Sequence, residues 1–130
     1  MKNLFLTFAM AFATVSAFTQ NKAKTPTNVV QHMVLFKFKA DITPAKLKEL
    51  EVGFASLPAQ IKEIVGFQWG INSSPEKLDK GFTHGYILTF KTEKDRDVYL
   101  PHPAHVAFGN LVKPWLADIT VLDFVNQYKP

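Results

Sequence analysis

Two side chains suited to acid–base chemistry, Tyr99 and His105, lie six residues apart in one short stretch of the sequence. This stretch, Tyr99 to Gly109, reads YLPHPAHVAFG and holds two of the four histidines of the chain. A histidine titrates near neutral pH and can abstract a proton beside a carbonyl group. A tyrosine hydroxyl can hold or protonate the oxyanion that then develops. The pair could therefore carry out proton transfer without a metal or an organic cofactor.

A helix has to position the histidine of this pair. Proline is favoured in the first turn of a helix, so we expect a helix to begin at or near Pro103 and to kink or end near Pro114. Apolar residues recur on one face of this helix, at Phe108, Leu111, Val112 and Trp115. His105 lies three residues before Phe108, shares that face and should point inward. A histidine in the first turn of a helix is also often a purely structural, hydrogen-bonded residue, so both roles stay open.

The rest of the chain predicts a small sheet with helices on one side. Alternating apolar residues predict strands over residues 31–39, 64–71, 82–91 and 119–126. A first helix should begin with Thr43 as its N-cap and Pro44 at its first position, and a short helical turn is expected over 93–100. The order strand, helix, strand, strand, helix, strand is that of a ferredoxin-like domain. We therefore expect an α+β fold with a four-stranded antiparallel sheet.

The first helix has a clear two-sided pattern. Its apolar stripe consists of Leu47, Leu50, Phe54 and Leu57. Its other side carries charged residues, which are Lys46, Lys48, Glu49 and Glu51. We expect the apolar stripe to pack on the sheet and the charged residues to face water.

The strands also carry apolar residues on the face that the helices do not cover. A monomer would expose that face to water, and a large exposed apolar patch indicates an interaction surface. The simplest partner is a second copy of the chain, related by a two-fold axis. Two such sheets packed face to face would close a barrel with an interior, so a homodimer is expected.

The N-terminal residues differ in composition from the rest. Residues 1–17 have one lysine, an uncharged apolar run and small residues at the end, which is the plan of a signal peptide. Residues 18–28 are polar and read as a flexible linker, followed by one domain over 29–130. The apolar run is too short to span a bilayer comfortably. We expect an exported, periplasmic or secreted protein without stable membrane insertion after the signal is removed.

Composition excludes several other classes of protein. The chain has 130 residues, 47% of them hydrophobic, which fits one domain with a real core. It has no cysteine, so it has neither disulfides nor a thiolate nucleophile. The formal charge of +4 is mild and lysines alternate with acidic residues, a pattern typical of a solvated surface. Nucleic acid is therefore not an expected partner.

A metal site is an alternative use of the histidines. His102 and His105 are three residues apart, while His32 and His84 begin strands that we expect to be parallel neighbours. Imidazoles suit zinc or copper. However, a helix start and two strand starts need not converge, and the motif has no acidic ligand. We therefore expect no metal and no other cofactor.

Three motifs together resemble the stress-responsive A/B barrel family of dimeric α+β barrel proteins. They are HMVLFKFK from His32, GFTH from Gly81 and YLPHPAHVAFG from Tyr99, and the resemblance covers roughly residues 30–128. The chain looks most like the branch that includes plant heat-stable proteins and olivetolic acid cyclase. The resemblance implies the fold, the dimer, and Tyr99 with His105 as a catalytic acid–base pair. Four further residues are candidates for substrate binding, namely His32, His84, Phe36 and His102.

Two functions remain open at this point. In the first, the protein binds a small apolar or aromatic molecule in the barrel cavity without defined turnover. In the second, it is a cofactor-independent enzyme that uses His105 and Tyr99 for cyclisation, isomerisation or oxygenation of an aromatic or polyketide-like compound. The sequence does not decide whether the protein is an enzyme.

Overall fold

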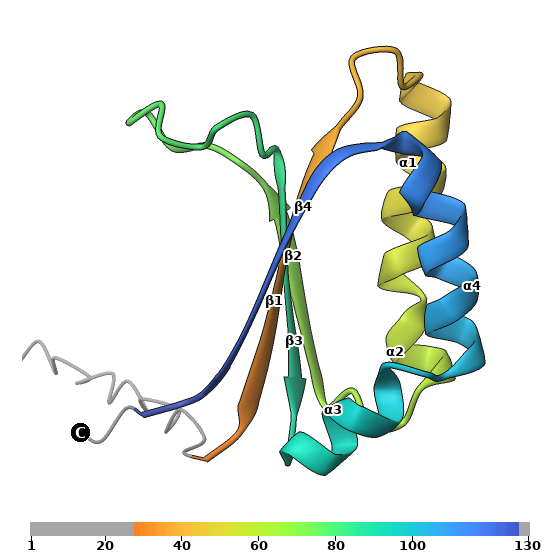
Figure 1. The fold of residues 1–130 in the computed structure, drawn as a ribbon, viewed down its shortest axis with the longest axis vertical. Helices are drawn as coiled ribbons and strands as arrows, with labels where there is room; N and C mark the ends of the chain where they lie inside the picture. Colours follow the sequence, from red (N-terminus) through yellow and green to blue (C-terminus); the bar gives the residue numbers. More distant parts are fainter. Residues whose placement is uncertain (1–27, 128–130) are drawn as a thin grey trace, which may run out of the picture.

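A four-stranded sheet with helices packed on one face forms the fold in the computed structural model, which describes residues 28–127 (Figure 1). The strands are β1 (Val30–Phe38), β2 (Gly66–Ile71), β3 (His84–Phe90) and β4 (Leu116–Val125). They lie in the order β2-β3-β1-β4, and every neighbouring pair is antiparallel. The predicted α+β, ferredoxin-like fold is therefore confirmed, with strand bounds shifted by a few residues. The predicted signal peptide (1–17) and nearly all of the linker (18–28) lie outside the described residues.

The helices begin where the sequence signals predicted. The segments are α1 (Pro44–Ala55), α2 (Leu57–Gln60), α3 (Glu93–Tyr99) and α4 (Pro103–Val112), with a 3₁₀ turn η1 (Lys113–Trp115) after α4. Thr43 caps α1, since its hydroxyl accepts a hydrogen bond from the backbone N–H of Lys46 at 3.2 Å. The last helix was expected to reach about Trp115. It ends at Val112 because Pro114 has no N–H for the helical pattern, and the chain tightens into η1.

The core lies between the helices and the sheet. Its centre is Phe54 of α1, whose ring stacks on Phe108 of α4 at 4.8 Å and on Phe36 of β1 at 5.7 Å between ring centroids. The ring of Tyr86 on β3 lies 4.3 Å from that of Phe54. Leu111, which was expected on the inward face of α4, is largely exposed. No helix in the described part of the chain is long and apolar enough to cross a membrane.

The metal-site hypothesis required the strands that carry His32 and His84 to be parallel neighbours. The structure contradicts this. β1 and β3 are antiparallel, so His84 pairs with Phe36 and His32 pairs with Leu88. Four residues of β1 separate His32 from the partner of His84, which corresponds to about 13 Å along the strand. The two histidines therefore lie at different ends of the sheet.

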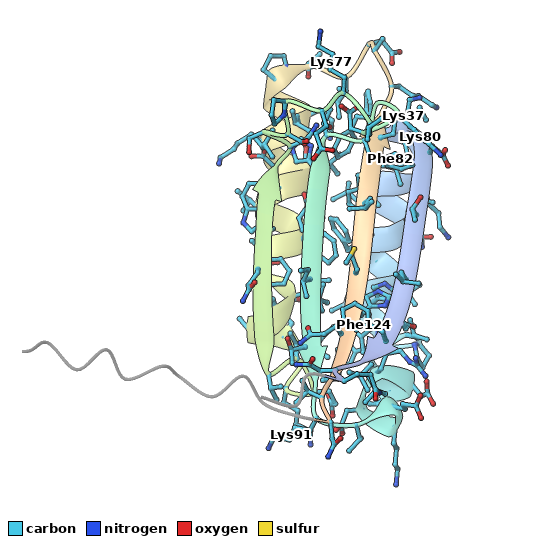
Figure 2. The ribbon with its side chains drawn as sticks, turned by 90° about the vertical axis from the view of Figure 1, so that its left-hand side faces the viewer. Lys37, Lys77, Lys80, Phe82, Lys91 and Phe124 are labelled. Carbon is cyan, nitrogen blue, oxygen red and sulfur yellow. The ribbon has the colours of Figure 1, made fainter. Side chains whose placement is uncertain are left out.

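The face of the sheet opposite the helices is open (Figure 2). By the strand register it carries Met33 and Leu35 of β1, Ile87 of β3, and Leu122 and Phe124 of β4. Leu122 is 55% exposed and Phe124 is 42% exposed. The sequence prediction of a second apolar face is thus confirmed. Both faces of β4 are apolar and accessible, because β4 is an edge strand.

Candidate functional site

A cavity of about 410 Å³ lies between α4 and the helix-facing side of β1 and β4. Tyr99, His105, His32 and Phe36, four of the six predicted site residues, line it. Its apolar wall also includes Val34, Phe54, Phe108, Val112, Ile119 and Val121. The cavity is inside one subunit. The sequence prediction put the ligand in the barrel interior, which the opposite face of the sheet would line; these four residues face the helices instead.

The turn between α3 and α4 brings Tyr99 and His105 together. Tyr99 is the last residue of α3, and His105 lies in the first turn of α4. Their ring centroids are 4.2 Å apart. The short connection between the two helices is stabilised by the backbone N–H of His102, which donates to the carbonyl of Tyr99 at 3.0 Å. The predicted pair therefore exists as a contact on the cavity wall.

The hydrogen bonding of His105 determines which of its ring nitrogens can act as a base. Nδ1 of His105 lies 2.8 Å from the carbonyl oxygen of Leu100. A carbonyl oxygen only accepts, so Nδ1 must carry the proton and donate it. Burial lowers the pKa of His105 below its ordinary value, the bond to Leu100 acts in the opposite direction, and the charge of Lys113 contributes to the lowering. The neutral ring therefore has a free lone pair on Nε2 at neutral pH.

Tyr99 is fully buried, and its hydroxyl has no hydrogen-bond partner among the described residues. The ring packs against Phe90 at 5.1 Å and against His32 at 5.6 Å between centroids. Burial, and after it the negative charge of Asp123, raises the pKa of Tyr99 above its ordinary value. The hydroxyl is thus protonated at neutral pH and keeps a hydrogen that no described residue accepts.

The ring of His32, which packs against Tyr99, is held in place by a hydrogen-bonded network with Asp123 and Arg96. Nδ1 of His32 donates to Oδ1 of Asp123 at 2.6 Å. The second carboxylate oxygen of Asp123 accepts from Arg96 at 3.0 Å. Asp123 and Arg96 were missed by the sequence reasoning, although an acidic residue at position 123, between the apolar Leu122 and Phe124, was a usable signal. The carboxylate fixes the orientation of the His32 ring on the cavity wall.

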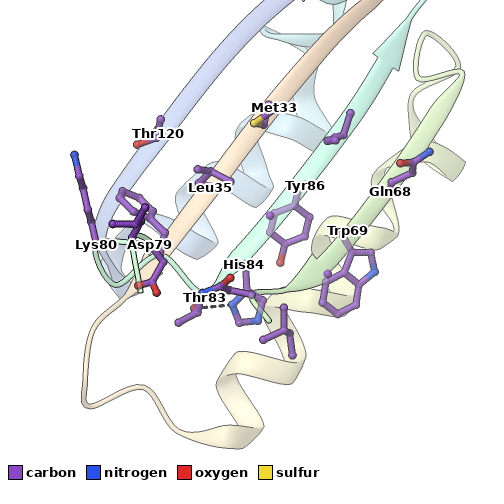
Figure 3. A pocket seen from close by; sticks show the side chains of 17 residues that line it. Met33, Leu35, Gln68, Trp69, Asp79, Lys80, Thr83, His84, Tyr86 and Thr120 are labelled. Carbon is purple, nitrogen blue, oxygen red and sulfur yellow. Dashed lines mark hydrogen bonds between the residues drawn. The ribbon is translucent and has the colours of Figure 1, made fainter. Parts of the chain in front are cut away.

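His84, a predicted substrate-binding residue, is not part of this cavity. Its Nε2 donates to Oε1 of Glu51 at 3.2 Å. The hydroxyl of Thr83 donates to its Nδ1 at 2.8 Å, as Figure 3 shows. Both ring nitrogens are therefore occupied by protein groups. Glu51 was expected to be solvated, but α1 turns it toward the sheet, where it is buried against His84. This pair joins α1 to the start of β3.

His102, the other predicted substrate-binding residue, is the N-cap of α4 and does not line the cavity. Its Nδ1 accepts a hydrogen bond from the backbone N–H of Ala104 at 3.2 Å. A side-chain acceptor at this position satisfies one of the free N–H groups of the first turn. The position of His102 is thus explained by the start of the helix.

A second hollow, of about 650 Å³, lies beside the loop between β2 and β3 (Figure 3). Met33, Leu35 and Ile87 from the helix-free face contribute to it, together with Leu78 and Phe82 of the loop. His84 lines this hollow with its ring nitrogens already bonded. Tyr86 also lines this hollow, and its ring centroid lies 6.4 Å from that of His84, against 4.2 Å between Tyr99 and His105.

The geometry gives no support to a metal site built from the four histidines. His32 and His84 are separated along the sheet, and His102 is turned to its own helix. In residues 28–127, no group of three or more histidine, aspartate or glutamate side chains could hold a metal ion. The site is therefore a mainly apolar cavity whose lining includes Tyr99, His32 and His105.

Comparison with known proteins agrees with the motifs. The family model described as Stress responsive A/B Barrel Domain matches residues 30–126. The stress-response A/B barrel domain-containing protein HS1 of Arabidopsis thaliana is 37% identical over 101 residues, which cover 78% of this chain and 89% of that protein. Olivetolic acid cyclase of Cannabis sativa is 28% identical over 98 residues, or 75% of this chain and 97% of the cyclase.

Solved structures show the same fold. The hydroxynitrile lyase of Passiflora edulis superposes with a TM-score of 0.74 at 25% identity, and covers 81% of this chain and 100% of its own. A dimeric ferredoxin-like protein of Bacteroides fragilis superposes with a TM-score of 0.62 at 25% identity, over 75% of this chain and 96% of its own. On the match to residues 30–126 and the identity to HS1, this chain belongs to the stress-responsive A/B barrel domain family.

Proposed function

We propose that the protein binds a small, mainly apolar or aromatic molecule in the cavity between α4 and the sheet. The observation that carries this proposal is the hydroxyl of Tyr99, which is buried without a partner at the wall of an apolar cavity. Buried polar groups in native proteins are nearly always hydrogen-bonded, and each exception needs an explanation. A ligand with a carbonyl or hydroxyl oxygen would supply the missing acceptor.

The size and lining of the cavity fit such a ligand. Pockets for small molecules have volumes of roughly 300–1,000 Å³ and mostly apolar walls with a few polar groups. The cavity here, at about 410 Å³, has aromatic and aliphatic walls and places Tyr99 and His105 side by side. An aromatic ketone is the simplest molecule that matches both the apolar wall and the hydroxyl.

Replacing Tyr99 by phenylalanine should stabilise the free protein and weaken ligand binding. An unsatisfied buried donor costs about 1–3 kcal/mol, so we expect the free energy of unfolding to rise by about 1 kcal/mol. Affinity for aryl ketones that shift the melting temperature of the unmodified protein should fall about tenfold. Urea unfolding and ligand-dependent melting measure the two effects.

Tyr86→Phe is the matched control, because Tyr86 is also a buried tyrosine but belongs to β3 and lines the other hollow. It should leave the affinity unchanged. If no aryl ketone or phenol in a broad panel raised the melting temperature, the binding proposal would be wrong.

Acid–base catalysis is a second candidate function, and the tautomer of His105 favours it. The bond to Leu100 fixes the proton on Nδ1, which leaves Nε2 as a base beside the protonated hydroxyl of Tyr99. A base and a hydrogen-bond donor at one cavity wall suit removal of a proton next to a carbonyl group. Two of the similar proteins are named as enzymes, a cyclase and a hydroxynitrile lyase, which supports this candidate. Cyclisation and isomerisation are the reaction classes in question.

The proposal includes a homodimer built on the helix-free face. Several proteins with this fold are described as dimeric, and the exposed Leu122 and Phe124 lie on that face. Light scattering of the purified protein should give twice the mass of the chain. Leu122→Lys should raise the dimer dissociation constant at least tenfold, because it would bury a charge in the interface. Val98→Lys, on the exposed side of α3, should leave the mass unchanged.

Export is also proposed, on the composition of residues 1–17 alone. Expression in a bacterial host followed by fractionation provides the test. A shortened protein in the periplasm, with its N-terminus near residue 18, supports export. Full-length protein in the cytoplasm contradicts it.

A further inference from the structure

We propose that the cavity selects an anionic ligand, with an apolar or aromatic body inside the cavity and a carboxylate-type group bound by Lys113. This inference rests on the proposed binding function and adds to it the charge class of the ligand and the residue that recognises it.

The described lining of the cavity has no acidic residue. It includes the ammonium of Lys113 and the imidazoles of His32 and His105, and no aspartate or glutamate is among its described residues. Asp123, whose carboxylate bonds the lining residue His32, does not itself line the cavity. Both of its oxygens are already bonded, one to His32 and the other to Arg96. A ligand carboxylate would therefore meet donors and a positive charge without a competing acidic wall.

Lys113 is available to bind such a group. It is the C-cap residue of α4, is exposed, and has no ion pair or side-chain hydrogen bond to another described residue. Its positive charge contributes to lowering the pKa of His105, which lines the same cavity. Lys39 lies at the same turn, since its ammonium donates to the carbonyl of Pro114 at 2.6 Å. Two ammonium groups thus make the potential positive at this end of α4.

The positions of the polar groups set the length of the ligand. His105 and Lys113 are eight residues apart on one helix and its cap, which is about 12 Å along the axis. A lysine side chain on a helix leans back toward the N-terminus, so the gap to be bridged is shorter than this. A ring with a ketone and a chain of two or three carbons to a carboxylate has the right dimensions. Its ketone would face Tyr99 and its carboxylate would face Lys113.

The matched probes are 4-oxo-4-phenylbutanoate and its methyl ester, which have the same aryl ketone and differ in charge. Calorimetry at 50 mM salt should show about fivefold tighter binding of the acid to the unmodified protein, the range of a partly exposed ion pair. Lys113→Met should reduce this ratio to about one by weakening only the acid. Raising the salt to 500 mM should reduce the ratio in the unmodified protein.

Lys62→Met is the control, because Lys62 is an exposed lysine that lines neither cavity. It should keep the fivefold ratio. Equal binding of acid and ester to the unmodified protein would overturn the charge inference and leave the binding proposal intact. An unchanged fivefold ratio in Lys113→Met would overturn the assignment to Lys113. If neither probe nor any neutral aryl ketone bound, the binding proposal and this inference would both fail.

Discussion

Replacing Phe54 by alanine is expected to lower the free energy of unfolding by about 3–5 kcal/mol, the range for large aromatic residues in a core. Phe54 is buried, and its ring contacts those of Phe36, Phe67, Tyr86 and Phe108. These rings come from three strands and from α4, so no single neighbour can fill the space that alanine leaves. Domains of this size have about 5–15 kcal/mol of stability in total, so the variant should be close to unfolding at 37 °C. Urea unfolding followed by tryptophan fluorescence measures the change.

Val52→Ala is the control for this prediction, since Val52 lies on the same helix and is 57% exposed. It should change stability by less than about 0.5 kcal/mol. Phe54→Leu retains most of the volume and should fall between the two, at about 1–2 kcal/mol. A loss below about 1 kcal/mol for Phe54→Ala would show that the helix layer is not held on the sheet through this residue.

The parts of the fold that follow from neighbours in the sequence could be predicted. Thr43 and Pro44 mark the start of α1 through contacts within one turn, and the structure has the cap as expected. Alternation along β1 and β3 is also local, so the two apolar faces of the sheet were predictable. The approach of Tyr99 to His105 belongs to this class, because only a short turn separates α3 from α4.

Contacts between distant segments could not be predicted in the same way. His32 and Asp123 are 91 residues apart, and only the register of β1 with β4 places them opposite one another. Glu51 carries a charge and sits among charged neighbours, so the pattern of α1 assigned it to water. The structure buries it because His84, on a different element, offers a hydrogen-bond donor. Such pairings depend on the topology, which periodicity does not encode.

The location of the cavity also could not be predicted from the sequence. The sequence indicated two apolar faces of the sheet, and a barrel interior seemed the natural place for a ligand. The register places His32 and Phe36 on the side that α4 covers, and α4 brings His105 to the same side. The lining residues named above therefore all come from one chain.

Burial shifts the pKa values of His105 and Tyr99 in opposite directions. It lowers the pKa of His105 and raises that of Tyr99, because in each case the neutral form is favoured away from water. At neutral pH the histidine ring is thus neutral and can accept a proton, while the tyrosine keeps its proton and can donate a hydrogen bond. The proposed catalytic role therefore assigns His105 as the base and Tyr99 as the hydrogen-bond donor to the developing oxyanion.

His105→Gln should abolish most of any proton transfer that the cavity catalyses, with a loss of about 10²–10⁴ in rate. The step is removal of the proton next to the ketone by Nε2, while the hydroxyl of Tyr99 hydrogen-bonds the enolate oxygen. In D₂O the enolate then takes up deuterium, so NMR of 4-oxo-4-phenylbutanoate or its methyl ester follows the exchange. Glutamine is polar and of similar length but has no basic nitrogen, so it cannot act as the base. Binding of the ligand should therefore be retained while exchange is lost.

The pH dependence of the exchange rate and a control variant at His102 distinguish a catalytic role of His105 from a structural one. The rate with the unmodified protein should be level at neutral pH and should fall only as the pH drops through the pKa of His105, which burial has lowered. An exposed histidine would lose activity at a higher pH. His102→Asn, which preserves a capping side chain outside the cavity, should keep the full exchange rate. Equal exchange in the unmodified protein and His105→Gln would show that the cavity binds its ligand without catalysing proton transfer through this histidine.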